Sequence, residues 1–118
     1  MGLRQERVGD EIRDILAVCF QGGRLSDPRL QAVTITAVKV TSDLQIAKVY
    51  FRVYATSSSS AKEVQEGLGS ASGYLRKQLA SQLDLRRIPE LKFYYDESVE
   101  NASNIEGMLA ELRKDEIG

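Results

Sequence analysis

The chain has 118 residues and a formal net charge of −1, with 42% hydrophobic and 28% charged residues. This length and composition predict one globular domain that folds without metal or disulfide support. The sequence contains no histidine and a single cysteine, which excludes a histidine-based catalytic triad, a histidine-ligated metal site and an internal disulfide within this chain. It contains neither an apolar run long enough to span a membrane nor an apolar signal-peptide core, so the expected location is the cytoplasm.

The charges are unevenly distributed along the chain. Residues 24–92 hold eleven lysines and arginines against six aspartates and glutamates, whereas the residues from Asp96 onward hold seven acidic and two basic side chains. A basic body with an acidic end is typical of proteins that bind polyanions. Ordinary solvated surface charge produces the same distribution, so both interpretations stay open at this point.

The first half of the chain predicts a helix followed by two strands. Apolar residues recur at helical spacing over residues 3–20, and two glycines at positions 22 and 23 end the helix. Cys19 lies on the apolar face, which predicts a buried thiol and no nucleophile. Residues 32–40 and 46–54 are rich in β-branched and aromatic residues and are joined by a short turn, so we expect antiparallel pairing. The alternation slips at Ala37-Val38, which predicts a β-bulge.

The second half predicts a long helix, a strand and a final short helix. Ser60 and Glu63 have the spacing of a capping box, and an apolar stripe continues from there to Leu83. Three glycines weaken this helix, so we expect a kink or break at residues 70–73. Pro89 predicts an extended chain that leads into a strand at 91–95. A last amphipathic helix is expected at residues 103–112.

Two groups of basic residues are candidate contacts with a polyanion. The first lies on the strand face that alternates away from the core, where cations neutralise phosphates and tyrosine rings stack on unpaired bases. Its members are Lys48, Tyr50, Arg52, Lys92 and Tyr94. The second group surrounds the expected helix break and the following turn, and it comprises Arg76, Lys77, Arg86 and Arg87. Because exposed strands carry lysine, arginine and tyrosine in many proteins, an ordinary solvated sheet face stays open as the alternative for the first group.

The sequence contains no motif that indicates catalysis or a cofactor. The Gly-Leu-Gly segment at 67–69 matches neither the phosphate-binding loop nor the dinucleotide fingerprint. The carboxylate pairs Asp96-Glu97 and Asp115-Glu116 lack the apolar surroundings of a general acid. We therefore expect no enzyme and no cofactor, and only an all-carboxylate magnesium site stays open as a metal centre.

Short motifs follow one another in a specific order along nearly the whole chain. They are Asp27-Pro28-Arg29, Val33-Thr34-Ile35-Thr36, Ser42-Asp43-Leu44, Ala47-Lys48-Val49-Tyr50, Gly73-Tyr74-Leu75-Arg76 and Leu85-Arg86-Arg87-Ile88-Pro89-Glu90-Leu91, with Val38, Phe93, Asp96 and Ser98. From Arg7 to about Leu112, this pattern closely resembles the ribosome-binding factor A family.

The resemblance implies a type II KH-like α+β fold. Residues 1–97 would form the KH-like RNA-binding domain, in the order helix, strand, strand, kinked helix, strand, and residues 98–118 would form an acidic C-terminal helix or tail. KH domains approach the RNA backbone through a Gly-x-x-Gly loop. This family has an Ala-x-Gly kink in its place, and the matching residues are Ala71, Ser72 and Gly73.

The resemblance also implies a function. The chain would be a non-enzymatic factor that binds the immature small ribosomal subunit and its ribosomal RNA, and that assists late maturation and processing of the RNA ends. It would act as a monomer, and an assembly GTPase is the implied partner for its release. The alternative is a small protein-interaction module that uses the acidic C-terminal helix or the sheet edge and does not bind RNA.

Overall fold

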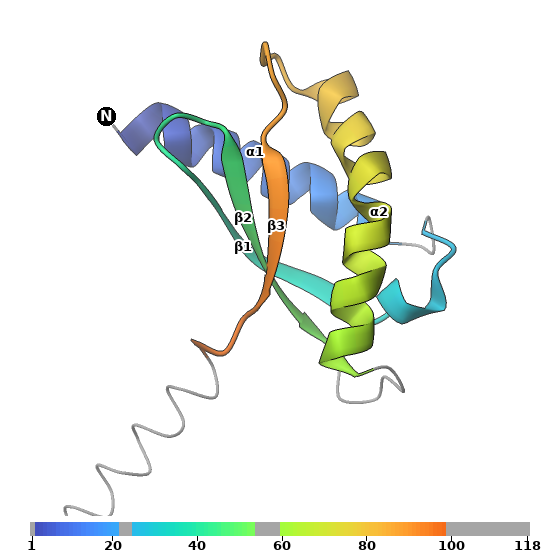
Figure 1. Ribbon diagram of the computed structural model, residues 1–118. Coiled ribbons are helices and arrows are strands. Elements are labelled where there is room, and N and C mark those ends of the chain that lie inside the picture. Colours follow the sequence, from blue (N-terminus) through green and yellow to red (C-terminus); the bar gives the residue numbers. More distant parts are fainter. Residues whose placement is uncertain (1, 22–24, 54–59, 99–118) are drawn as a thin grey trace, which may run out of the picture.

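The computed structural model describes residues 2–21, 25–53 and 60–98. Its elements follow in the order α1 (Gly2–Phe20), a 3-10 turn η1 (Pro28–Leu30), β1 (Val33–Val40), β2 (Ile46–Val53), α2 (Ala61–Gln82) and β3 (Glu90–Tyr95) (Figure 1). This order confirms the predicted α+β class and agrees with a type II KH-like arrangement. The glycines predicted to end the first helix, the last residue of the predicted second strand and the helix expected at 103–112 lie outside the described residues.

The three strands form one mixed sheet in the order β1-β2-β3. β1 pairs antiparallel with β2 as predicted, and β2 pairs parallel with β3 because α2 connects them as a crossover. The β1–β2 register shifts between Ile35 and Ala37, which makes Thr36 the extra residue of a β-bulge. The predicted bulge is therefore confirmed, one residue earlier than the slip in the apolar pattern. Beyond the bulge Val40 is buried and Lys39 is exposed on the opposite face.

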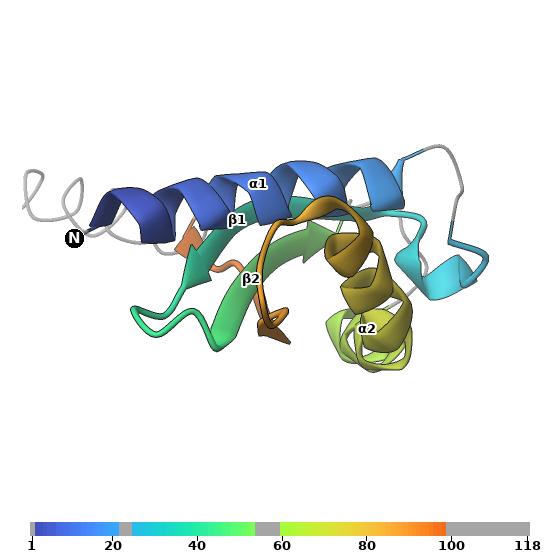
Figure 2. The same ribbon diagram turned by 90° about the horizontal axis from the view of Figure 1, so that it is seen from above.

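The hydrophobic core lies on one face of the sheet, where both helices pack. Figure 2 shows α1 running across the sheet and α2 beside it, seen nearly along its axis. The core includes Val8, Ile12, Leu16 and Cys19 from α1, Ala47, Val49 and Phe51 from β2, and Val64, Leu68, Leu75 and Leu79 from α2. Cys19 is buried, as predicted from its place on the apolar face of the helix. Within the described chain, no helix combines the length and apolar character that a membrane span needs.

The long helix α2 runs without interruption from Ala61 to Gln82, which contradicts a break at residues 70–73, while a kink at these residues stays a prediction. Four of its apolar side chains are fully buried, and each such burial contributes about 1.5–3 kcal/mol. This gain outweighs the cost of about 1 kcal/mol for each glycine in a helix. The hydroxyls of Ser70 and Ser72 donate to the carbonyl oxygens of Glu66 and Gly69, a pattern that bends helices without breaking them.

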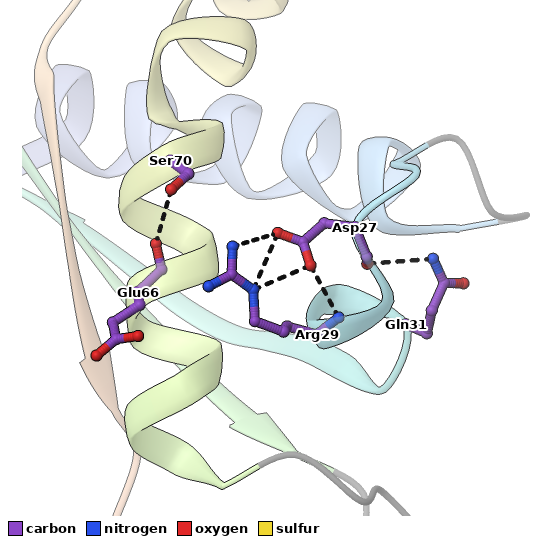
Figure 3. Close-up of polar contacts among 5 residues, drawn as sticks. All are labelled: Asp27, Arg29, Gln31, Glu66 and Ser70. Carbon is purple, nitrogen blue, oxygen red and sulfur yellow. Dashed lines mark hydrogen bonds and ion pairs between the residues drawn. The ribbon is translucent and has the colours of Figure 1, made fainter.

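A short turn before β1 is fixed by an ion pair and docks on α2 (Figure 3). Asp27 caps η1 by accepting from the backbone N–H of Arg29 at 2.9 Å, and the Arg29 guanidinium donates to the same carboxylate, with Nη2 at 2.7 Å. The side-chain hydrogen bond from Arg29 lowers the pKa of Asp27 below its usual value. Leu30 follows in the turn and is buried in the core, which anchors η1.

Both outer strands have glutamine side chains bound to their backbone carbonyl oxygens. Gln65 of α2 donates from Nε2 to the carbonyl oxygen of Phe93 on β3 at 2.6 Å. Gln5 of α1 donates in the same way to the carbonyl oxygen of Val40 on β1. Because unpaired edge carbonyls invite strand addition from other chains, these contacts protect the sheet from edge-to-edge association.

Candidate nucleic-acid interface

An arginine-lined groove lies where the β1–β2 turn, the start of α1 and the loop after α2 come together. This arginine groove has a volume of about 460 Å³. Its charged lining residues are Arg4, Arg76, Arg86 and Arg87 together with Asp43 and Glu90. Three of the four basic residues predicted around the helix end, namely Arg76, Arg86 and Arg87, therefore meet in one groove. Lys77 is exposed on α2 and does not line it.

Backbone contacts hold the loop that carries Arg86 and Arg87. Arg76 donates from Nη2 to the carbonyl oxygen of Ile88 at 2.9 Å, which ties the loop to α2. Pro89 is fully buried at the end of the loop, and the Glu90 N–H donates to the carbonyl oxygen of Gln45 at 2.8 Å. The two arginines thus lie on a short segment that is fixed on both sides.

The opposite wall of the groove is the turn between β1 and β2. Leu44 adopts a left-handed backbone conformation with φ of 61°, which is strained for a residue other than glycine. The Asp43 carboxylate accepts from the Thr41 hydroxyl at 2.7 Å and from the Gln45 N–H at 3.1 Å. These hydrogen bonds, the Thr41 hydroxyl first, lower the pKa of Asp43. Asp43 therefore stays ionised at neutral pH and is occupied by its own turn.

Sequence reasoning missed the contribution of α1 to this surface. Arg4 lines the arginine groove, and Arg4 and Arg7 line a neighbouring hollow together with Glu11 and Asp84. The spacing of the helix could have revealed it. Arg4 lies four residues, about one turn, before the buried Val8, so the two residues share the side of α1 that faces the rest of the fold.

The exposed face of the sheet carries a row of three lysines. Lys39 pairs with Lys48 across β1 and β2, and Lys48 pairs with Lys92 across β2 and β3. All three side chains are exposed. Lys48 and Lys92 were predicted to lie on this face. Lys39 was missed as a site residue because its position depends on the bulge at Thr36, which reverses the alternation of β1.

Two tyrosines form the next row on the same face. Tyr50 pairs with Tyr94, and their ring centroids are 5.7 Å apart with an angle of 32° between the planes. The Lys39 Nζ atom lies 5.8 Å from the centroid of the Tyr50 ring, within reach of a cation–π contact. Tyr94 is 42% exposed. The structure therefore brings together four of the five residues predicted for this face, Lys48, Tyr50, Lys92 and Tyr94.

The fifth predicted residue, Arg52, is engaged within the protein. Its Nη1 atom donates to the carbonyl oxygen of Asp96 at 2.7 Å, and its guanidinium lies 5.5 Å from the centre of the Tyr95 ring. Asp96 also accepts from the Thr36 hydroxyl at 2.6 Å and from the Ser98 N–H at 2.9 Å. Hydrogen bonds from Ser98 and Thr36 lower the pKa of Asp96 to about 2. Arg52 thus helps to fix the chain where it leaves β3.

The cations of both surfaces outnumber the carboxylates beside them and form no ion pair with a carboxylate of the described chain. Among residues 2–21, 25–53 and 60–98, the ion pair that forms is Arg29–Asp27, and the arginine groove and the lysine row contribute none. The same residues bring no three His, Cys, Asp or Glu side chains together as metal ligands. Unpaired cations gathered in a groove and on a sheet face are able to neutralise a polyanion such as RNA.

Comparison with known proteins gives the family. A family model described as Ribosome-binding factor A matches residues 4–109. The chain belongs to the ribosome-binding factor A family. A ribosome-binding factor A from Macrococcus caseolyticus is 39% identical over 115 residues, which cover 98% of this chain and 99% of the relative.

Solved structures of ribosome-binding factor A share the fold. The crystal structure of the protein from Thermus thermophilus has a TM-score of 0.69 at 26% identity, over 77% of this chain and 93% of that one. A homology model of the Thermus thermophilus protein, fitted into a cryo-electron microscopy map of a complex with the 30S subunit, has a TM-score of 0.64 at 26% identity. That match covers 79% of this chain and 96% of the Thermus chain.

Proposed function

We propose that the chain is a non-enzymatic assembly factor that binds the immature small ribosomal subunit through its ribosomal RNA and assists late maturation and processing of the RNA ends. The observation that carries the proposal is the arginine groove, where Arg4, Arg76, Arg86 and Arg87 meet without an ion pair to a described carboxylate. Support comes from the Thermus relative, which was fitted into a map of a 30S complex.

The continuous helix α2 directs RNA binding away from the usual KH site. A Gly-x-x-Gly loop binds RNA because its backbone N–H groups are free to approach phosphates. In this chain Ala71, Ser72 and Gly73 lie inside an α-helix, where backbone N–H groups are used by the helix itself. Phosphate contacts must therefore come from side chains, and the groove arginines at the end of the same helix are the nearest clustered source.

An assembly factor also has to leave its ribosomal site. Its affinity must be greater for the immature RNA conformation than for the mature one, because only a differential affinity lets binding favour one state. We include in the proposal an assembly GTPase as the partner for release and action as a monomer in the cytoplasm. The proposal also includes an RNA-binding domain at 1–97 with an acidic C-terminal helix or tail at 98–118, which is part of the same domain or an appendage to it. No cofactor is required for these steps.

Co-sedimentation with immature and mature small subunits over a series of salt concentrations tests the proposal. We expect binding to immature subunits that weakens steeply with salt, and weaker binding to mature ones. Replacing both Arg86 and Arg87 with glutamine should reduce the slope of log K against log salt by about 1 for each lost phosphate contact. Lys62→Gln is the matched control, since Lys62 is exposed on α2, lies outside the groove and belongs to neither basic group. Salt-independent binding that survives nuclease treatment would instead support the protein-interaction module.

A further inference from the structure

The lysine row on the exposed sheet face is an arrangement that folding alone does not favour. Lys39, Lys48 and Lys92 lie directly opposite one another across three strands, and like charges in that position destabilise a sheet. The described carboxylates nearby form no ion pair with these lysines. Glu90 lies at the end of the face, two residues before Lys92, and Asp96 is occupied at the other end by Thr36 and Ser98.

Glu6 is the described carboxylate that approaches the row from a helix. It shares a hollow at the β1 edge with Lys39, without an ion pair between them. The row therefore keeps its positive charge available for an anion outside the described chain.

The tyrosine row indicates which kind of anion this face binds. Tyr50 and Tyr94 lie two residues along their strands from Lys48 and Lys92, a separation of about 6.6 Å. A small residue, Ala37, pairs with Tyr50 on its other side. Cations and aromatic rings thus alternate in adjacent rows, as phosphates and bases do in a nucleic-acid strand.

We propose that this face is a second RNA contact that binds an unpaired stretch, with phosphates on Lys48 and Lys92 and a base stacked on the exposed ring of Tyr94. Bases within a duplex are already stacked and cannot lie flat on a protein ring, so the tyrosines select single-stranded RNA. An acidic protein would use the lysines but would not need the exposed ring. The inference rests on the proposed ribosomal function for the source of the RNA.

The two surfaces meet at one end of the sheet. Glu90 and Gln45 line the arginine groove, while Glu90 pairs with Ile46 at the start of the parallel strands β2 and β3. Lys48 and Lys92 form the next pair on that face. One RNA segment is therefore able to pass from the groove onto the sheet without crossing the helices.

Binding of short RNA to the full chain tests this face separately from the groove. The probes are a single-stranded oligouridylate of about ten nucleotides, an RNA duplex of the same length, and polyglutamate as a polyanion without bases. We expect the single strand to bind more tightly than either competitor, with amide NMR shifts on β2 and β3. Tyr94→Leu should weaken binding of the single strand about tenfold while leaving the slope of log K against log salt unchanged.

A charge variant completes the test. Replacing both Lys48 and Lys92 with glutamine should reduce the single-strand salt slope by about 1.4, since each neutralised phosphate contributes about 0.7. The thermal midpoint should stay the same or rise, because the substitution removes like-charge repulsion. Lys62→Gln, at an exposed position of α2 that belongs to neither basic group, should change neither quantity.

The outcomes separate the inference from the proposed function. Full binding of the single strand by Tyr94→Leu would overturn the stacked base and with it the selection of unpaired RNA. Binding of polyglutamate as tight as that of the single strand would overturn the nucleotide contact and point to an acidic protein. Intact binding of immature subunits by wild type and sheet variants alike would overturn the inference and leave the proposed function standing. Single-strand binding that depends on Tyr94, in a wild-type chain without affinity for immature subunits, would overturn the proposed function and retain the RNA contact.

Discussion

Gly67 of α2 lies against Arg29, whose Nε atom would be only 3.2 Å from a Cβ atom added to the glycine. The same Cβ would lie 3.1 Å from Cδ2 of Leu30 and 3.3 Å from a carboxylate oxygen of Asp27. Arg29 and Asp27 hold each other through several hydrogen bonds, and Leu30 is buried. None of these atoms moves freely, so the missing side chain at position 67 lets η1 dock on the helix.

Gly67→Ala should therefore destabilise the protein although alanine favours helix. Overpacking destabilises a folded protein by about 1–3 kcal/mol, whereas the higher helix propensity of alanine over glycine stabilises the helix by about 1 kcal/mol. We expect the free energy of unfolding in urea to fall by about 1 kcal/mol. Gly69→Ala is the matched control, because its Cβ would meet nothing within 4 Å apart from its own neighbours and helix backbone, and it should gain about 0.5–1 kcal/mol. A Gly67→Ala protein as stable as Gly69→Ala would show that η1 adjusts without cost.

The Asp96 carboxylate should make stability depend on pH in the acidic range. Its pKa of about 2 in the folded protein lies below the ordinary value of 3.8, so the ionised form is favoured by folding. The contribution is complete above about pH 5 and is lost as pH falls from about 4 through 2. For this half-buried group we expect Asp96→Asn to cost about 1 kcal/mol at pH 7, after allowance for solvent screening.

Urea unfolding of wild type and Asp96→Asn at a series of pH values measures this difference. The two stabilities should converge toward pH 2, while Thr36→Val should reproduce part of the loss at pH 7, because it removes the hydroxyl that donates to Asp96. Glu97→Gln is the control for a neighbouring charge. A constant difference between wild type and Asp96→Asn from pH 7 to pH 2 would mean that the charge of Asp96 does not contribute.

The hydrogen bond from Gln65 to Phe93 should matter for both stability and solubility. Gln65→Met keeps the length of the side chain but removes the donor, which leaves an edge carbonyl of β3 without its partner. We expect a loss of about 1 kcal/mol in unfolding free energy and a concentration-dependent tendency to self-associate. Sedimentation velocity and urea unfolding measure the two effects. Gln82→Met, at an exposed position of the same helix, should remain monomeric and equally stable.

The sequence was sufficient to predict the helices and strands because the local signals, namely apolar periodicity and helix capping, agree with the observed packing. The alternation of Ala47, Val49 and Phe51 matches the buried face of β2, and the Ser60 hydroxyl accepts from the Glu63 N–H at the start of α2 as predicted. The helix break was wrong because glycine propensity is a local cost, whereas the gain that overcomes it comes from distant residues that cover Leu68 and Leu75.

The site was predicted only in part, for a related reason. Arg76, Arg86 and Arg87 are close in sequence, so their proximity was predictable, but Arg4 reaches the groove from the other end of the chain. Lys39 joined the sheet face only through the bulge at Thr36. No periodicity predicts that Arg52 binds the backbone of Asp96, since that contact depends on how β3 ends.

Arg76 should have two separable roles, in charge and in positioning. Arg76→Met keeps the apolar stem and removes both the positive charge and the hydrogen bond to the Ile88 carbonyl oxygen. We expect faster amide hydrogen exchange in the loop at 83–89 and a salt slope for RNA binding that falls by about 0.9 or less for one lost contact. Arg4→Met removes a charge from the same groove, and the described residues supply no hydrogen bond to its guanidinium. It should reduce the salt slope by a similar amount and leave loop exchange unchanged. Identical exchange in both variants would show that the Arg76–Ile88 contact does not hold the loop. The positions of Arg86 and Arg87 would then depend on the burial of Pro89 and on the hydrogen bond from the Glu90 N–H to Gln45.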